Sequence, residues 1–221
     1  MKKLIAVVPI RKGSQRVKNK NFRPFAGKNL LIHKIELLKK VDFIDEIIIN
    51  TDSDQAISIA RELDVKYFKR DDYFASSKCP NSDFWKNIAE NTKSEFIMFT
   101  NCTSPMIKLS TYQNIIKIFN EVLENSNFDS VNTVTELKEF LFKDNEPLNF
   151  KTNETPNSQD LPDIVKLNFA INILRTKDMS ERKSLIGKNP YLYKLDEVEG
   201  LDINSEFEYS FAEFLFNQKD E

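Results

Sequence analysis

Residues 4–9 read Leu-Ile-Ala-Val-Val-Pro, and residues 10–21 continue Ile-Arg-Lys-Gly-Ser-Gln-Arg-Val-Lys-Asn-Lys-Asn. The first run is apolar and β-branched, which is typical of a strand buried on both faces. The second run is a polar loop. Apolar residues then recur at the spacing of one helical face: Leu30, Leu31, Ile35, Leu37 and Leu38. A strand, loop and helix in this order place backbone N–H groups and a helix N-terminus at the carboxyl edge of a sheet, where phosphate groups bind.

The charge of this region is entirely positive. Glu36 is the first acidic residue, although the whole chain has a net charge of −2. Seven cations lie in the loop or just after it: Arg11, Lys12, Arg16, Lys18, Lys20, Arg23 and Lys28. A polyphosphate bound there would meet donors without a competing carboxylate, and Gly13 would let the backbone approach it closely. We therefore predict a phosphate-binding loop; the alternative is a solvated basic loop.

The composition describes an ordinary soluble protein. Its 221 residues, 40% hydrophobic and 30% charged, predict a single domain, 1–221, with a substantial core. No apolar run approaches the roughly 18 residues of a membrane span. Cys79 and Cys102 lack the spacing of metal ligands, so a reduced, cytoplasmic setting is expected. A mechanism based on the single histidine, His33, is not expected because that residue lies on the first helix.

Apolar strands and amphipathic helices alternate along the next hundred residues. Strands are predicted at 46–50, 65–68, 95–99 and 129–134, and helices at 57–63, 82–91 and 109–123, with Ser82 as an N-cap. This order predicts an α/β, Rossmann-like fold with a mainly parallel sheet flanked by helices. The polar stretches that follow the strands (11–21, 51–54, Arg70 and 101–105) would then line one crevice.

The character of the chain changes near residue 136. Between 136 and 160 the hydrophobic density falls, which predicts an arm or flap instead of core. Strand-like alternation returns at 164–174 and 191–195, and Ser205 is a plausible N-cap of a final helix. About 136–175 is therefore expected to form an arm and an insertion beside the crevice.

Four motifs in chain order resemble those of the acylneuraminate cytidylyltransferases, the CMP-sugar synthetases. They are Arg11-x-Gly13-Ser14-x₅-Lys20-Asn21, Thr103-Ser104-Pro105, Gln159-x-Leu161-Pro162 and Asp202-Ile203-Asn204-Ser205-Glu206. The resemblance spans nearly the whole chain. It implies a magnesium-dependent nucleotidyltransferase in which CTP and a nonulosonic acid, of the sialic acid type, give a CMP-sugar and pyrophosphate. It also implies a homodimer with a protruding dimerisation arm.

The same resemblance assigns roles to individual positions. It implies catalytic roles for Arg11, Lys20 and Asp202, with Mg²⁺ held by Asp202. The nucleotide would be bound by Arg11, Gly13, Ser14, Arg16, Lys20, Asn21, Arg70 and Ser82, and the sugar acid by Asn101, Ser104, Gln159 and Lys166. For Arg70 the alternative is a surface arginine paired with Asp71 or Asp72.

Two positions depart from the family pattern. Gln15 stands where the family usually has a lysine that acts on the phosphates, and Asn204 replaces the second aspartate of the late metal motif. Mg²⁺ often takes only one or two carboxylates together with phosphate oxygens, so Asp202 alone could serve. A catalytically weakened nucleotide-binding homologue is the alternative that these two changes favour.

The sequence is also compatible with other functions. Asp52-x-Asp54 after an apolar strand resembles the metal-binding motif of glycosyltransferases that use nucleotide-sugars. Within the cytidylyltransferase interpretation, the acceptor could also be an eight-carbon sugar acid or a phosphonate. Nucleic-acid binding is not expected because a chain with a pI near 5.7 lacks a broad basic face.

Overall fold

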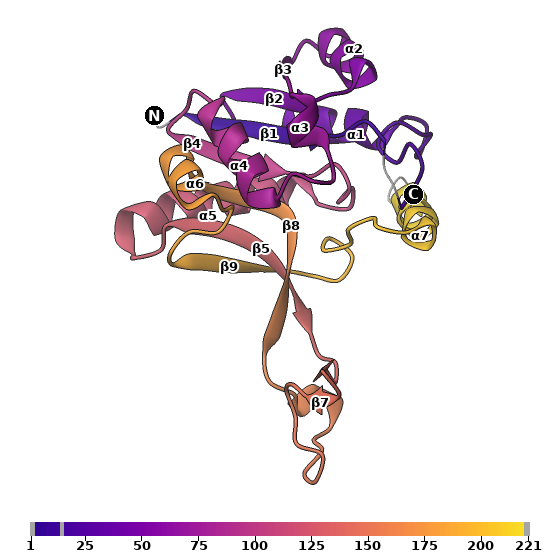
Figure 1. Cartoon of the computed structure of the whole chain (residues 1–221), viewed down its shortest axis with the longest axis vertical. Helices are drawn as coiled ribbons and strands as arrows, with labels where there is room; N and C mark the ends of the chain where they lie inside the picture. The colour runs from indigo at the N-terminus through magenta and orange to yellow at the C-terminus, as the bar shows by residue number, and fades with distance from the viewer. Residues whose placement is uncertain (1–2, 14–15, 219–221) are drawn as a thin grey trace.

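A seven-stranded sheet forms the centre of the structure, a computed structural model that describes residues 3–13 and 16–218, except for the side chains of residues 124 and 125 (Figure 1). The strand order is β3-β2-β1-β4-β8-β5-β9, and β8 alone runs antiparallel to its neighbours. The strands are β1 (Leu4–Ile10), β2 (Glu46–Thr51), β3 (Lys66–Lys69), β4 (Phe96–Thr100), β5 (Ser130–Leu137), β8 (Ile164–Arg175) and β9 (Pro190–Leu195). The prediction of a mainly parallel, Rossmann-like sheet is confirmed.

Helices cover both faces of this sheet. One apolar cluster joins alternate residues of β1, such as Ala6 and Val8, to α1 (Leu30–Leu38), α2 (Asp54–Glu62), α5 (Leu109–Asn125) and α7 (Glu206–Asn217). The other cluster joins Ile5 and Val7 to α4 (Asn81–Glu90) and α6 (Thr176–Arg182), while α3 (Asp72–Ala75) lies before α4. Because β1 is apolar on both faces, it lies in the middle of the sheet.

The strand order places a crevice beside β1. From β1 the chain moves to β2 and β3 on one side and to β4 on the other, so the loops leaving β1 and β4 diverge at their carboxyl ends. Ligands of open α/β sheets bind at such a switch point. The basic loop follows β1 there, and residues 101–105 follow β4.

Two helix starts differ from the sequence prediction. Helix α2 begins at Asp54, because the Ser53 side chain accepts a hydrogen bond from the Ala56 N–H and caps it. Helix α4 begins at Asn81 with Pro80 at the N-cap position, so Ser82 lies inside the helix and the predicted Ser82 cap is wrong. The predicted Ser205 cap is confirmed, since its side chain accepts from the Glu208 N–H.

The ends of β5 and β8 leave the sheet and continue as an arm. This arm carries the short strands β6 (Phe142–Lys143) and β7 (Glu146–Pro147) and a 3₁₀ turn (Ser158–Asp160). Figure 1 shows it projecting away from the sheet. In the part of the chain that the structure describes, no helix combines the length and the apolar character needed to cross a bilayer.

Candidate active site

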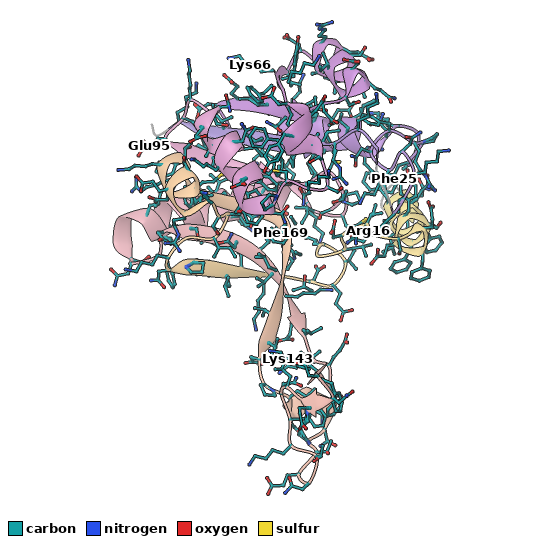
Figure 2. The ribbon with its side chains drawn as sticks, viewed as in Figure 1. Arg16, Phe25, Lys66, Glu95, Lys143 and Phe169 are labelled. Carbon is teal, nitrogen blue, oxygen red and sulfur yellow. The ribbon has the colours of Figure 1, made fainter. Side chains whose placement is uncertain are left out.

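Two adjoining cavities open at the carboxyl ends of β1 and β4. Both are lined by Pro9, Arg11, Arg16 and Asn101. We call the one of about 470 Å³ the basic cavity; it also contains Gly13, Lys20, Asn21, Cys102, Thr103, Asp202 and Asn204. We call the one of about 540 Å³ the aromatic cavity; it also contains Arg70, Phe74, Ser76, Ser77, Cys79, Asn81, Phe84, Trp85, Phe99 and Phe169. Figure 2 labels Arg16, from the loop after β1, and Phe169, from β8; both line the aromatic cavity.

The loop after β1 exposes its backbone and its cations to the basic cavity. Gly13 has φ +76°, and a Cβ at this position would have no atom within 4 Å, so the backbone here is open to a ligand. The Lys12 N–H donates to Asp52 Oδ1 at 2.7 Å, which ties the loop to the end of β2. Within the described residues, no carboxylate forms an ion pair with Arg11 or Arg16. Both guanidinium groups are therefore available to an anionic ligand.

Lys20 connects the basic loop to the segment before α7. Its Nζ donates to the backbone oxygen of Ile203, 183 residues later in the chain. Burial lowers the pKa of Lys20, and the nearby Asp202 carboxylate partly opposes this effect. A desolvated ammonium group interacts more strongly with an anion than one exposed to water does. Lys20 is thus placed to bind negative charge in the cavity.

Asp202 is held in place by its neighbours. Its Oδ1 accepts a hydrogen bond from Thr103 Oγ1 at 2.5 Å, and its Oδ2 accepts one from Asn204 Nδ2 at 2.7 Å. The Ile203 N–H donates to the Thr103 backbone oxygen, so this segment lies against the loop after β4. Asn204 therefore orients the Asp202 carboxylate, a role that a second, charged aspartate could not fill.

A magnesium ion fits Asp202 only if most of its ligands come from elsewhere. The described residues contain no group of three or more histidine, cysteine, aspartate or glutamate side chains that could hold a metal. Each Asp202 oxygen accepts one hydrogen bond and keeps further lone-pair capacity. Mg²⁺ is commonly bound by one or two carboxylates and completed by substrate phosphates and water. Asp202 therefore suits a metal ion whose other ligands are the oxygens of a bound polyphosphate and water.

Arg70 lies at the wall of the aromatic cavity and is almost fully buried. Its Nε donates to Asn50 Oδ1 and its Nη2 to the Asn50 backbone oxygen, both at 2.7 Å, and Nη2 also reaches the Ile10 oxygen at 3.2 Å. Its guanidinium lies over the Phe84 ring, 4.4 Å from the centroid. Burial lowers the pKa of Arg70 to about 10, so it remains a cation at neutral pH. The alternative of a surface ion pair with Asp71 or Asp72 is wrong.

Four predicted ligands do not line either cavity. Ser82 follows Asn81, the helix residue that does line the aromatic cavity. Ser104 is fully buried, whereas Gln159, in the 3₁₀ turn of the arm, and Lys166, near the start of β8, are exposed. Lys166 does lie on a half-buried strand, paired with Thr135 of β5, but its own side chain is exposed. Ser14 and Gln15 lie outside the described residues.

The sequence prediction missed the aromatic side of the site. Phe74, Phe84, Trp85, Phe99 and Phe169 all line the aromatic cavity, together with Ser76, Ser77, Cys79 and Asn81. Adjacent Phe84 and Trp85 on a mainly polar helix were a usable signal, because only one side of that helix faces the sheet. Asp52 and Asp54 line neither cavity: Asp52 accepts the Lys12 N–H, and Asp54 is exposed in the first turn of α2. The arrangement expected of a glycosyltransferase is thus not formed around these cavities.

Comparison with known proteins agrees with this geometry. Curated relatives include the post-translational flagellin modification protein B of Campylobacter coli, 26% identical over 231 residues, covering 99% of this chain and 97% of the relative. A CMP-N,N'-diacetyllegionaminic acid synthase of Campylobacter jejuni is 25% identical, with 99% and 97% coverage. An N-acylneuraminate cytidylyltransferase of Escherichia coli is 24% identical over 95% of this chain and 51% of the relative.

A solved structure shows the same fold. A CMP:2-keto-3-deoxy-manno-octonic acid synthetase complexed with CTP superposes with a TM-score of 0.72 at 14% identity, covering 98% of this chain and 99% of that one. The family model described as cytidylyltransferase matches residues 5–193, most of the chain. The chain belongs to the cytidylyltransferase family.

Proposed function

We propose that this enzyme transfers the cytidylyl group of CTP to a hydroxyl of an acidic sugar of the nonulosonic type, with release of pyrophosphate. The observation that carries the proposal is the junction of the two cavities at Arg11, Arg16 and Asn101. At this junction the basic cavity, whose cations suit a polyphosphate, adjoins the larger aromatic cavity, which has room for a nucleoside and an acceptor. The names of the relatives support an acidic sugar as the acceptor.

The residues that line each cavity indicate which part of the substrates it would bind. The triphosphate lies in the basic cavity against Arg11, Gly13 and Lys20, where cations and an open backbone converge. The cytosine lies toward Ser76, Ser77 and Asn81, whose side chains offer the donors and acceptors that distinguish one base from another. The acceptor lies beside Asn101 and Phe169, on the opposite side of the α-phosphate.

The chain's own groups act mainly by orientation and charge. Attack of the acceptor hydroxyl on the α-phosphorus moves negative charge onto the departing pyrophosphate. Arg11 and Lys20, aimed at the basic cavity before the reaction, stabilise that charge without reorganising. Asp202 is fixed by Thr103 and Asn204 in the position where it would hold Mg²⁺. Magnesium, when bound, supplies further charge neutralisation to the phosphates.

Arg11→Ala should weaken CTP binding by about 1.5–3 kcal/mol, the scale of a hydrogen bond to a charged group. The side chain lines both cavities and pairs with no described carboxylate, so its loss removes a phosphate ligand and little folding energy. Isothermal titration with CTP measures the change. Lys18→Ala, a nearby exposed lysine that lines neither cavity, is the control and should bind CTP as the unaltered enzyme does.

The activity is tested by pyrophosphate release from each of the four ribonucleoside triphosphates against a panel of acceptors, with and without Mg²⁺. The panel contains nonulosonic acids, an eight-carbon sugar acid and a phosphonate. We expect turnover with CTP and a nonulosonic acid, dependent on Mg²⁺. Binding of CTP without turnover would indicate the weakened homologue, and consumption of a nucleotide-sugar would indicate a glycosyltransferase.

We further infer that the enzyme is a cytoplasmic homodimer assembled through the arm. Phe140, Phe142 and Leu148 are 41%, 61% and 59% exposed, and they lie together on an element that has little core of its own. Large exposed apolar patches commonly mark interfaces. Two free thiols, Cys79 and Cys102, suit a reducing compartment, where CTP is also available.

Phe142→Glu should shift the protein from dimer to monomer, because a charged side chain is costly inside an apolar interface. Sedimentation velocity at several protein concentrations measures the shift. Lys143→Glu changes the charge of the adjacent exposed arm residue and serves as the control. A monomeric unaltered enzyme, or a dimer that tolerates Phe142→Glu, contradicts assembly through this patch.

A further inference from the structure

Phe169 has a backbone conformation that is unusual for a bulky residue in a strand. Its φ is +55°, in the left-handed region, although it lies within β8. The pairing of β5 with β8 is irregular at this point: Asn132 pairs with Asn172, but Val134 pairs with Leu167. Four residues of β8 therefore stand opposite the single residue between these pairs on β5. Phe169 is part of a β-bulge, a feature that redirects a side chain.

Buried hydrogen bonds hold this bulge in place. Thr133 Oγ1 donates to Asn168 Oδ1 at 2.7 Å and accepts from the Ile171 N–H at 3.0 Å. Asn168 Nδ2 donates to Thr135 Oγ1 at 2.9 Å, and Asn168 Oδ1 accepts from the Ala170 N–H at 3.2 Å. Asn168 is 6% exposed and Thr133 fully buried, so these bonds are shielded from water. None of these bonds involves the Phe169 side chain.

The bulge alone does not explain a phenylalanine. Glycine adopts a positive φ without steric strain, whereas a residue with a Cβ does not. A phenylalanine at this position is therefore strained, and strain of this kind is found where it serves a site. A role of this residue in the site would be carried by its ring, which also packs against the apolar cluster that contains Ile97 and Phe99.

Phe169 lines the aromatic cavity beside Trp85. Its ring centroid lies 6.0 Å from that of Trp85, with an angle of 35° between the planes, and both residues line that cavity with Asn101. Trp85 comes from α4 and Phe169 from β8, so two elements meet to form one apolar wall. An apolar wall favours an apolar group and gives no hydrogen bond to a hydroxyl.

We propose that Phe169, with Trp85, is the specificity-determining wall of the acceptor pocket. It selects sugar acids that present a methyl group, as a deoxy terminus or an N-acyl methyl, over acids that present a hydroxyl at the same position. This inference rests on the proposed function. It adds to that function the chemical group by which the enzyme distinguishes its acceptor.

The test compares two nonulosonic acids that differ only by a terminal methyl or hydroxymethyl group, with CTP saturating. The unaltered enzyme should favour the methyl acid in kcat/KM by about tenfold or more, the scale of one group in an apolar pocket. Phe169→Gly should reduce this preference to nearly one while leaving the KM for CTP unchanged.

A matched variant separates the ring from the backbone. Phe169→Ala also removes the ring but keeps a Cβ at positive φ, so it should lose the same preference and unfold at a lower urea concentration than Phe169→Gly. Trp85→Leu, which alters the other half of the wall, should lower the preference without changing the strain at position 169.

The outcomes are distinct. If Phe169→Gly and Phe169→Ala lower kcat/KM equally for both acids and keep their ratio, the ring is a packing element and the proposal is overturned. An unaltered enzyme that turns over both acids equally also overturns it. An unaltered enzyme that turns over neither acid with CTP refutes the proposed function itself.

Discussion

Lys20→Met should lower kcat by about 10²–10³-fold, the effect of removing one donor to a charge that develops in the transition state. Lys20 lies in the basic cavity, partly desolvated, and methionine keeps its length without its charge. The Lys20 bond to Ile203 also joins the basic loop to the Asp202 segment, so the loop loses an anchor as well. Steady-state pyrophosphate release gives kcat and KM.

The pH dependence provides a second measurement of Lys20. Because burial lowers its pKa, Lys20 loses its proton at a lower pH than an ordinary lysine does. Activity should therefore fall as the pH rises through this lowered pKa. In Lys20→Arg the cation persists, and the fall should move to higher pH. If activity falls over the same alkaline pH range in both proteins, another group is responsible for the fall.

Arg70→Met should destabilise the fold by about 3 kcal/mol and weaken CTP binding as well. The substitution leaves the Asn50 side chain and the Asn50 and Ile10 backbone oxygens without their donor, and an unpaired buried acceptor costs about 1–3 kcal/mol. It also removes the cation over Phe84. Urea unfolding measures the loss.

Lys69→Met is the matched control for Arg70→Met. Lys69 is the preceding residue and is exposed, so its replacement should change the unfolding free energy by no more than about 0.5 kcal/mol. If Arg70→Met unfolds at the same urea concentration as Lys69→Met, the hydrogen bonds of Arg70 to the ends of β1 and β2 do not stabilise the fold. If stability falls but CTP affinity does not, the role of Arg70 is purely structural.

Much of the fold could be predicted because its signals are local. The strand at residues 4–9 is apolar on both faces, and the rule that parallel strands present their loops at one edge brings Arg11, Arg70 and Asn101 to one crevice. Asp202 lies nearly two hundred residues after Arg11 in the chain, yet both line the basic cavity. Its place there was predicted from the motif resemblance, because no periodicity of the sequence indicates it. Arg11 and Asn101 line both cavities, Arg70 only the aromatic one and Asp202 only the basic one. The roles of all four in the reaction stay predictions.

Some predicted ligands line neither cavity, and the reasons are tertiary; their roles stay predictions. Ser104 belongs to the Thr103-Ser104-Pro105 motif, and Ser82 lies near the start of α4. The direction of each side chain depends on tertiary packing, which a single sequence does not reveal. Lys166 alternates with apolar residues on β8 and pairs with Thr135 of β5, yet its side chain is exposed and lines neither cavity. The Phe169 bulge is invisible in the sequence because a left-handed phenylalanine contradicts local propensity.

In the proposed function, the loop after β1 binds the triphosphate of CTP. Isothermal titration of cytidine, CMP, CDP and CTP, each into the unaltered enzyme and into Arg11→Ala, tests it most directly. We predict that affinity rises with each added phosphate in the unaltered enzyme and that most of this rise disappears in Arg11→Ala. Equal affinity for cytidine and CTP, or a rise that Arg11→Ala preserves in full, would contradict the account.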